Sequence, residues 1–364
     1  MNSTKKIKLL IITPSLQCGG SEKFVSMVCG HINTQLFSVC LVVVNNSRPF
    51  YTITNPAINI IGLKRTGCFF FTGYKKAVNE FDPDIVFSTA NHLNLYLAIF
   101  RNRFPKKIKF IAREASIVSI NSRHAKMPVL YNMLIKKFYH RFDMIICQSA
   151  YMQHDLVKNY RIPEHKTTVM HNATPEVPVK IIQAAGKPAA RVHTFITIAR
   201  LSTEKGIERL VHAVGLLTIP FKYFIIGEGD QRNQLQQLID ELQLQDKIIL
   251  TGEKTEPFAG LDDADLLLVG SYYEGFPNVV LEAGARGIPV IAFNVPGGLA
   301  EIITANNGLL VEDNDIIAFA SAINTALAAG FNREDIITST TKRFSVYRLM
   351  QDMEKLFLQL AANK

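Results

Sequence analysis

Two glutamates eight residues apart, Glu274 and Glu282, lie in a segment whose spacing could bind an anion and a sugar together. Residues 271–292 read SYYEGFPNVVLEAGARGIPVIA, with Pro277 where a helix is expected to begin, a position at which proline is favoured. Backbone N–H groups at a helix start attract an anion, and the helix dipole strengthens that attraction. A lone glutamate there would more simply complement the dipole, but the whole string favours a ligand site.

This segment predicts a division of roles. We expect a phosphate to meet the amides of the helix start, Glu274 to accept hydrogen bonds from sugar hydroxyls, and Glu282 to accept them from a ribose. The residues expected to surround the donor at this point are Gly275, Phe276, Pro277, Asn278 and Val279.

A doubly wound α/β fold is the element pattern that would position this segment. Short apolar runs rich in β-branched residues alternate with helical stretches, as in parallel sheets covered on both faces. The expected strands are residues 8–13, 38–45, 84–89, 109–112 and 144–148, and then 193–199, 222–226, 247–250, 266–270 and 289–293. The proline-containing stretch 174–192 is the linker candidate between domains 1–174 and 175–346, and a final helix over 347–364 is expected to pack back on the first domain.

The segment from Glu274 to Glu282, followed by Ala283, Gly284, Gly287, Pro289 and Val290, resembles the signature of retaining glycosyltransferases of family 4. That resemblance implies the GT-B fold, with two Rossmann-like domains facing across a cleft, and a UDP- or GDP-sugar as donor. Residues 200–206 (RLSTEKG) match the family segment in which Arg200 and Lys205 would hold the donor diphosphate. Four glycines and one lysine in other strand-end loops would also bind the donor: Gly19, Gly20, Gly227, Gly229 and Lys254.

One departure concerns the middle of the N-terminal domain. Many family members carry a histidine at the end of a strand near the reacting carbon, whereas this sequence has Arg113 and Glu114 there. We assign both as candidate catalytic residues, with Glu274, Arg200 and Lys205. A surface pair after a strand is the alternative. His92, after another strand, is a candidate for the acceptor side or an ordinary loop histidine.

Acidic clusters raise the question of a metal. Asp82–Asp84, Asp262–Asp265 and Asp313–Asp315 each precede a strand or helix, where aspartate caps or turns the chain. We therefore assign no metal and no cofactor. Five scattered cysteines without a Cys-x-x-Cys pair favour neither disulfides nor zinc.

The charge is divided unevenly along the chain. Residues 1–174 contain 23 Lys and Arg against 8 Asp and Glu, whereas the remainder carries a net negative charge. The positive charge is interleaved with large apolar residues at 65–76, 93–109 and 127–142, a pattern typical of contact with anionic lipid. Solvated tips of packing helices are the alternative, and no nucleic-acid motif accompanies the charge.

These features predict a cytoplasmic enzyme, without a signal peptide or membrane-spanning helix, that is peripheral on the inner face of the plasma membrane. It would move a hexose or N-acetylhexosamine from a nucleotide-sugar donor to a lipid-linked oligosaccharide in the synthesis of a bacterial surface polysaccharide such as O-antigen or capsule. A nucleotide-sugar epimerase and a non-catalytic scaffold subunit on the same fold are the alternatives.

Overall fold

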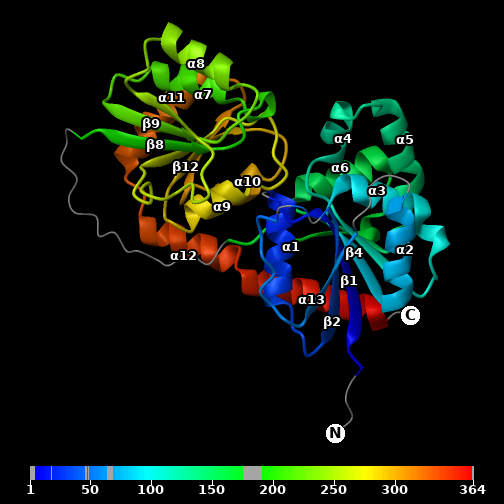
Figure 1. The fold of residues 1–364 in the computed structure, drawn as a ribbon. Helices are drawn as coiled ribbons and strands as arrows, with labels where there is room; N and C mark the ends of the chain where they lie inside the picture. The colour runs from blue at the N-terminus through cyan, green and yellow to red at the C-terminus, as the bar shows by residue number, and fades with distance from the viewer. Residues whose placement is uncertain are drawn as a thin grey trace. The chain divides into compact units, whose positions relative to one another are not determined.

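The chain forms two compact units, each built around a parallel sheet (Figure 1). The structure is a computed structural model that describes residues 5–17, 19–45, 47, 49–63, 69–174 and 191–362. The first unit comprises Met1–Asn172 together with Val346–Lys364, and the second comprises Ala173–Ser345. Most of the expected linker, Cys18 and Cys68 lie outside the described residues.

The sheet of the first unit has the strand order β3-β2-β1-β4-β5-β6-β7, and neighbouring strands run parallel. Its strands are β1 (Ile7–Ser15), β2 (Phe37–Asn45), β3 (Ile58–Gly62), β4 (Ile85–Ser88), β5 (Lys109–Arg113), β6 (Met144–Cys147) and β7 (Thr167–Val169). Its helices are α1 (Gly20–His31), α2 (Phe69–Phe81), α3 (Asn91–Phe100), α4 (Val118–Asn121), α5 (Pro128–Phe138), α6 (Ala150–Tyr160) and α13 (Val346–Ala362). Figure 1 shows α1 and α2 on opposite sides of β1.

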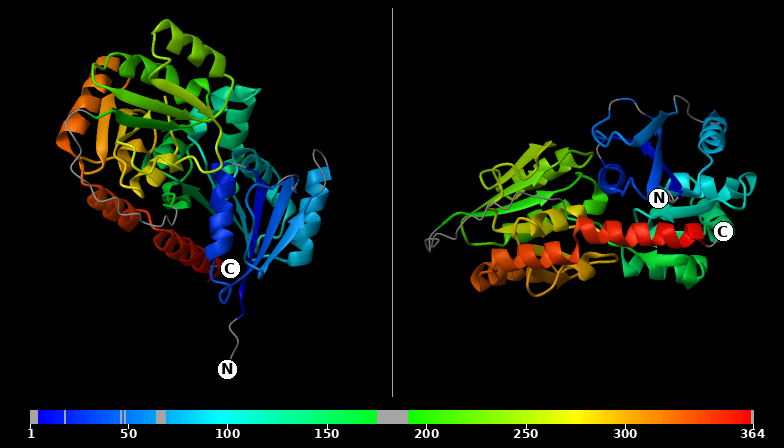
Figure 2. Two further views of the ribbon diagram at one scale, coloured as in Figure 1. Left: turned by 60° about the vertical axis from the view of Figure 1, so that its left-hand side comes forward. Right: turned by 90° about the horizontal axis from the view of Figure 1, so that it is seen from below.

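The C-terminal helix α13 belongs to the first unit, although it is last in the sequence. It contacts α1, and the right-hand view of Figure 2 shows it lengthwise, in red. The buried ring of Phe357 lies 6.0 Å from that of Phe37 on β2 and 5.7 Å from that of Phe87 on β4. This aromatic packing supplies apolar burial that holds the helix on the sheet.

The sheet of the second unit has the order β10-β9-β8-β11-β12-β13, again parallel. Its strands are β8 (His193–Ile198), β9 (Phe221–Ile226), β10 (Ile248–Gly252), β11 (Leu266–Val269), β12 (Val290–Asn294) and β13 (Gly308–Glu312). Its helices are α7 (Ile207–Gly215), α8 (Arg232–Glu241), α9 (Asn278–Gly284), α10 (Leu299–Ile302), α11 (Ile316–Ala329) and α12 (Arg333–Arg343).

Three strands were not among those expected from the sequence, and all three are at sheet edges. β3 buries only its first residue fully, β7 has three residues, and β13 begins with a glycine. An edge strand is covered less completely than a central one, so it need not carry the continuous apolar run by which a buried strand is identified. The central strands do carry that run, as in residues 9–12 of β1, which are fully buried.

Each sheet has one point at which the strand order reverses direction. In the first unit this point lies between β1 and β4, and in the second unit it lies between β8 and β11. Loops leaving the carboxyl ends of such neighbouring strands diverge to opposite faces of the sheet, and the crevice between them is where open α/β sheets bind ligands. The candidate residues of the two units are therefore expected at these two positions.

Candidate active site

The reversal point of the second unit brings Lys205 and Glu274 together. Lys205 follows β8, Glu274 follows β11, and Lys205 Nζ lies 2.6 Å from Glu274 Oε1. Ser271 Oγ also donates a hydrogen bond to Glu274 Oε1, at 2.6 Å. Both side chains of the ion pair are largely but not fully shielded from solvent, at 23% and 13% exposed. The result is a fixed carboxylate beside a fixed cation, at the end of the sheet where a ligand is expected.

Two glycines allow these loops to meet. Gly206, with φ of +52°, packs directly against Gly270, and a Cβ at Gly206 would lie 2.2 Å from the Gly270 carbonyl oxygen. A Cβ at Gly270 would likewise lie 2.4 Å from the Gly206 oxygen. The close backbone approach therefore requires glycine at both positions. It places Lys205 within reach of the loop that carries Glu274.

The backbone of Glu274 is held from a third side by the loop after β12. Glu274 N–H donates to the Pro296 carbonyl at 3.0 Å, and Gly298 N–H donates to the Glu274 carbonyl at 3.2 Å. Gly297, with φ of +126°, has no room for a Cβ, which would fall on the Glu274 carbonyl oxygen. The carboxylate is thus carried by a backbone segment whose own polar groups are already satisfied.

Arg209 of α7 holds the loop after β11, which carries Glu274. Its side chain is 4% exposed, and its guanidinium donates to the carbonyl oxygens of Gly270 (2.6 Å) and Ser271 (2.5 Å) and to Asp313 Oδ1 (2.7 Å). It also lies over the ring of Tyr272, 4.1 Å from the centroid. A guanidinium has five donors in a rigid plane, which suits it to fix two successive carbonyls and a carboxylate at once.

The other residues of the second unit that were expected to bind the sugar-nucleotide donor are either exposed side chains or tightly packed glycines. Arg200 and Lys254 are exposed in the loops after β8 and β10. Gly227 and Gly229 instead pack against the backbone after β8, where a Cβ at either would lie about 2 Å from the carbonyl oxygen of Ala199 or Leu201. The N–H of Gly227 donates to the Gly252 carbonyl, so that amide is already used within the protein.

The start of α9 differs from the sequence expectation in detail. Pro277 occupies the N-cap position with φ of −72° and ψ of 117°, and the helix itself begins at Asn278, so the expectation that proline opens the helix was wrong by one residue. Extended ψ is what a residue outside the helix adopts, and proline's fixed φ is compatible with it. Gly275 and Val279, on either side of this point, are half-buried. Glu282, one turn into the helix, is half-buried as well.

Phe276 contributes packing at this helix start. Its side chain is 4% exposed, and its ring lies 5.6 Å from that of Phe344. α9 has only seven residues, so it aligns few peptide dipoles. An anion bound here would therefore depend strongly on nearby cationic side chains.

In the first unit, the candidate glycines lie after β1 at the reversal point. Gly19 is the N-cap of α1 with an extended backbone, and α1 begins at Gly20. The space beside Gly19 is taken by the Glu22 carboxylate, since a Cβ would lie 2.4 Å from Glu22 Oε2. His92 is exposed near the start of α3, directly after β4.

Arg113 and Glu114 are buried, at 2% and 0% exposed, so the alternative of a surface pair is wrong. Asn94 Nδ2 donates to Glu114 Oε1 at 2.8 Å, and the Arg113 guanidinium donates to Asn172 Oδ1 and lies 3.6 Å from the ring centroid of Phe24. Burial raises the pKa of Glu114 to about 7, because desolvation disfavours the carboxylate more than the Asn94 hydrogen bond favours it. Burial also lowers the pKa of Arg113.

Most aspartates of the three acidic clusters have structural partners. Asp84 accepts from the Lys8 amide, Asp265 accepts from the Thr194 amide, and Asp315 caps α11 by accepting from the Ala318 amide. Asp82 pairs with Lys107, and Asp313 pairs with Arg209. These partners support the interpretation that the clusters cap and join elements.

Sequence reasoning missed several residues that build the site. Ser271 was within the quoted segment but had no assigned role, and Arg209 was not singled out. A charged residue on a helix is normally solvated, so only the tertiary structure could reveal that Arg209 faces inward. Asn94 and Asn172 likewise gave no signal, because an isolated asparagine is typical of any loop or helix surface.

Comparison with known proteins agrees with these observations on both halves of the chain. Residues 18–175 match the family model described as Glycosyltransferase Family 4, and residues 180–343 match the model described as Glycosyl transferases group 1. A Campylobacter jejuni relative, N-acetylgalactosamine-N,N'-diacetylbacillosaminyl-diphospho-undecaprenol 4-alpha-N-acetylgalactosaminyltransferase, is 29% identical over 321 residues, which cover 85% of this chain and 87% of that protein.

Solved structures share the whole fold at low sequence identity. A sucrose-phosphate synthase from Thermosynechococcus elongatus superimposes with a TM-score of 0.82 at 20% identity, covering 99% of this chain and 100% of that one. The lipopolysaccharide outer core galactosyltransferase WaaB gives a TM-score of 0.77 at 19% identity, covering 97% and 99%. With both halves of the chain matched and both sheets of the expected type, the protein belongs to glycosyltransferase family 4, has the GT-B fold and is a glycosyltransferase.

Proposed function

We propose that this enzyme transfers a hexose or N-acetylhexosamine from a UDP- or GDP-sugar to a lipid-linked glycan, with retention of the anomeric configuration. The observation that carries the proposal is the Lys205–Glu274 pair at the reversal point between β8 and β11. It sets a cation for phosphate beside an acceptor for sugar hydroxyls, which are the two groups joined in a nucleotide sugar.

In the proposed reaction the bond between the anomeric carbon and the donor phosphate breaks, and an acceptor hydroxyl forms its bond on the same face of the sugar. The departing nucleoside diphosphate takes the proton of that hydroxyl, so no added base is needed. Arg200 and Lys205 stabilise the negative charge that grows on the leaving group. No metal is required in this scheme.

The residues have distinct roles in this scheme. Lys205 and Ser271 both contact Oε1 of Glu274, which leaves Oε2 to accept a hydrogen bond from a sugar hydroxyl. We assign the helix-start residues and Glu282 to the nucleotide and Arg200 to the outer side of the diphosphate.

In the first unit we keep Gly19 and Gly20, which follow β1, as donor-binding residues. We assign His92, which follows β4, to the side where the acceptor hydroxyl would enter. Arg113 and Glu114 are buried in a hydrogen-bonded group, so we assign them the role of positioning the chain after β5.

The lipid-linked acceptor is supported by the relatives. The Campylobacter jejuni protein is named for a diphospho-undecaprenol substrate, and a Salmonella typhimurium relative, 33% identical over 195 residues, is named as a putative colanic acid biosynthesis glycosyltransferase. We propose a corresponding role in bacterial surface polysaccharide synthesis. No helix among the described residues is long and apolar enough to span a membrane. We propose that the protein is cytoplasmic and binds the inner face of the plasma membrane through its basic N-terminal half.

The test is a panel of UDP- and GDP-sugars incubated with the enzyme and a bacterial lipid extract, with products identified by mass spectrometry. We expect nucleoside diphosphate release that depends on the extract, an α-linked product by NMR from an α-linked donor, and no loss of activity in EDTA. Conversion of the donor without any acceptor would instead indicate an epimerase. Absence of turnover with every donor would overturn the proposal.

A further inference from the structure

Helix α5 presents large apolar side chains to solvent at its N-terminal end. Met127, which caps the helix, is 63% exposed, and Val129, Leu130 and Met133 within it are 83%, 38% and 54% exposed. Positions 129 and 133 are one turn apart and therefore share a face of the helix. The first unit has no second helix whose described residues include so many exposed large apolar side chains.

The opposite face of α5 holds the helix on the protein. Ile135 is fully buried, and Asn132 Oδ1 accepts a hydrogen bond from Tyr160 of α6 at 2.5 Å. The helix is therefore anchored along one side, and its exposed apolar side chains belong to an ordered element. Single exposed apolar residues are ordinary, whereas four on adjacent turns mark an interaction surface.

Among the side chains that the structure describes, the other two basic and aromatic segments seen in the sequence form no such surface. In α3 the side chains of Leu93, Leu95 and Leu97 are buried. In α2, Tyr74, Ala77 and Val78 are buried as well. These six side chains serve the core of the first unit, as the alternative of packing helices predicts. Of the three segments, α5 is the one in which apolar side chains remain available, within the described part of the chain.

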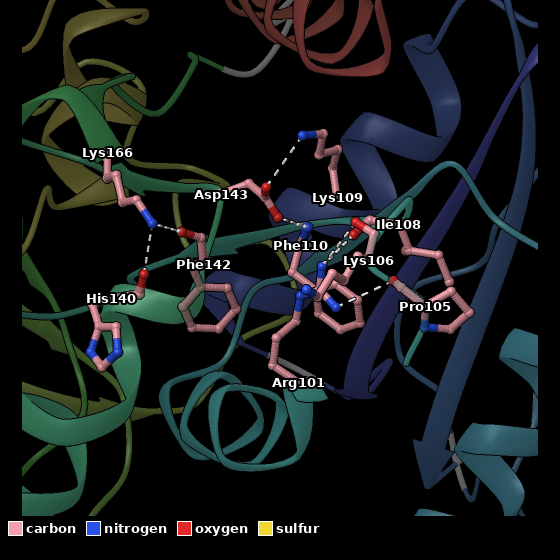
Figure 3. A network of polar contacts seen from close by, with 10 residues as sticks. All are labelled: Arg101, Pro105, Lys106, Ile108, Lys109, Phe110, His140, Phe142, Asp143 and Lys166. Carbon is pink, nitrogen blue, oxygen red and sulfur yellow. Dashed lines mark hydrogen bonds and ion pairs between the residues drawn. The ribbon is translucent and has the colours of Figure 1, made fainter. Parts of the chain in front are cut away.

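Charge separates the segments further. Figure 3 shows three basic side chains with contacts inside the first unit: Arg101 donates to the carbonyl of Ile108 at 2.8 Å, Lys109 pairs with Asp143, and Lys166 donates to the carbonyl of His140 at 2.7 Å. Side chains held by such contacts within the unit are less free to turn toward a lipid surface.

The segment around α5 carries its charge on the outside. Between Glu114 and Asp143 the sequence has no acidic residue and five Lys and Arg. Arg123, Lys126, Lys136 and Lys137 are all exposed, and they flank the apolar group on both sides. Exposed apolar side chains bordered by cations are what an anionic bilayer surface binds, through burial below the headgroups and attraction to them.

We propose that the N-terminal part of α5 is the element that inserts into the membrane, with Met127, Val129 and Met133 below the headgroups and the flanking lysines on anionic lipid. A second copy of the chain is disfavoured as the occupant. In a symmetric dimer the same patch faces itself, which would set these cations against one another with no acid in the segment to offset them. This inference rests on the proposed lipid-linked acceptor for its biological purpose, but vesicle binding can be measured without turnover.

The first experiment is vesicle flotation without any sugar nucleotide. We expect binding to vesicles of phosphatidylglycerol and phosphatidylcholine, and weak binding to phosphatidylcholine alone. The variant V129S/M133S should bind the anionic vesicles about tenfold more weakly or worse, since each buried methylene contributes about 0.8 kcal/mol. The matched control is I317S/L216S, which removes two exposed apolar side chains from the second unit (76% and 55%) and should bind as wild type does.

Charge is tested in parallel. K136E/K137E should lose binding that depends on anionic lipid, whereas K75E/K76E on α2, which changes two exposed lysines of the same unit, should lose clearly less. Equal losses from both charge variants, or unchanged binding of V129S/M133S, would overturn the proposal. Thermal unfolding of each variant is compared with wild type, and since all substituted side chains are exposed we expect unchanged midpoints.

A second measurement uses the absence of tryptophan from the sequence. Val129→Trp introduces a single reporter, whose emission should shift to the blue with anionic vesicles and be quenched by brominated acyl chains. Ile317→Trp is the control and should do neither. An unshifted Val129→Trp spectrum on vesicles that bind the protein would overturn the proposal, as would a dimer in solution that V129S/M133S dissociates. These outcomes do not depend on whether the enzyme turns over any donor.

Discussion

Lys205 and Glu274 are 69 residues apart in sequence, yet Nζ of one lies 2.6 Å from Oε1 of the other. The relationship depends on the adjacency of β8 and β11 and on the contact of two glycine backbones, Gly206 and Gly270. A cation and a carboxylate that are both partly shielded interact more strongly than an exposed pair. Their proximity places the proposed phosphate and sugar contacts side by side before any ligand binds.

The first prediction concerns this pair. Glu274→Gln and Lys205→Met should each lower kcat by about 10²–10³-fold, the cost of removing one preorganised electrostatic contact from a transition state. Because the two groups act together, the double variant should lose much less than the product of the two single losses. Steady-state kinetics with the productive donor checks this. Lys222→Met, at an exposed lysine of β9, is the control and should keep wild-type activity.

The second prediction concerns Gly206. Gly206→Ala should destabilise the second unit and lower activity, because its Cβ would lie 2.2 Å from the Gly270 carbonyl and push the two loops apart. Gly330→Ala is a matched control, with a similar φ of +64° but open space around it, and should cost only about 1–2 kcal/mol of backbone strain with kcat unchanged. Chemical denaturation and kinetics measure the two effects. Equal loss of stability in both variants would show that the close approach is not the determinant.

A third prediction assigns Arg209 as a positioning residue for the Glu274 loop. Arg209→Met should lower the free energy of unfolding by about 3 kcal/mol and reduce kcat, because two buried carbonyls and Asp313 lose their donor. Arg209→Lys should restore the charge but not the planar set of bonds, so it should recover stability more than kcat.

Asp313→Asn serves as the comparison for Arg209. Asp313 is 37% exposed, so this change should cost less than about 1 kcal/mol and leave kcat near wild type. An Arg209→Met enzyme that keeps its kcat after correction for folded fraction would contradict the positioning role.

The fourth prediction is a pH dependence from Glu114. Its pKa in the folded protein is raised from 4.5 to about 7, so folding favours the protonated acid. The contribution to stability is therefore fully present below pH 4.5 and is lost as the pH rises through about 7, with a slope of up to about 1.4 kcal/mol per pH unit. Glu114→Gln mimics the protonated form and should remove this loss. Denaturation curves of both proteins between pH 4 and pH 8 check it, and parallel stability profiles would contradict it.

The sequence by itself determined the fold class and most of the central strands, and it predicted that the segments around Glu274 and Arg200 bind the donor. It could do so because buried parallel strands are continuous apolar runs and because glycine and proline mark the loops that follow them. The edge strands β3, β7 and β13 escaped prediction, since an edge strand is only partly covered and need not be a continuous apolar run.

Only the tertiary structure decided what each polar side chain does. Arg209 and Glu114 look like ordinary charged residues in the sequence, but the fold buries both and gives each its partners. Three segments of similar basic and aromatic composition differ in their described side chains, because α2 and α3 bury apolar side chains in the core and α5 exposes several. Local composition sets which residues are apolar or charged, whereas the packing of elements distant in sequence sets which of them meet water, one another or a ligand.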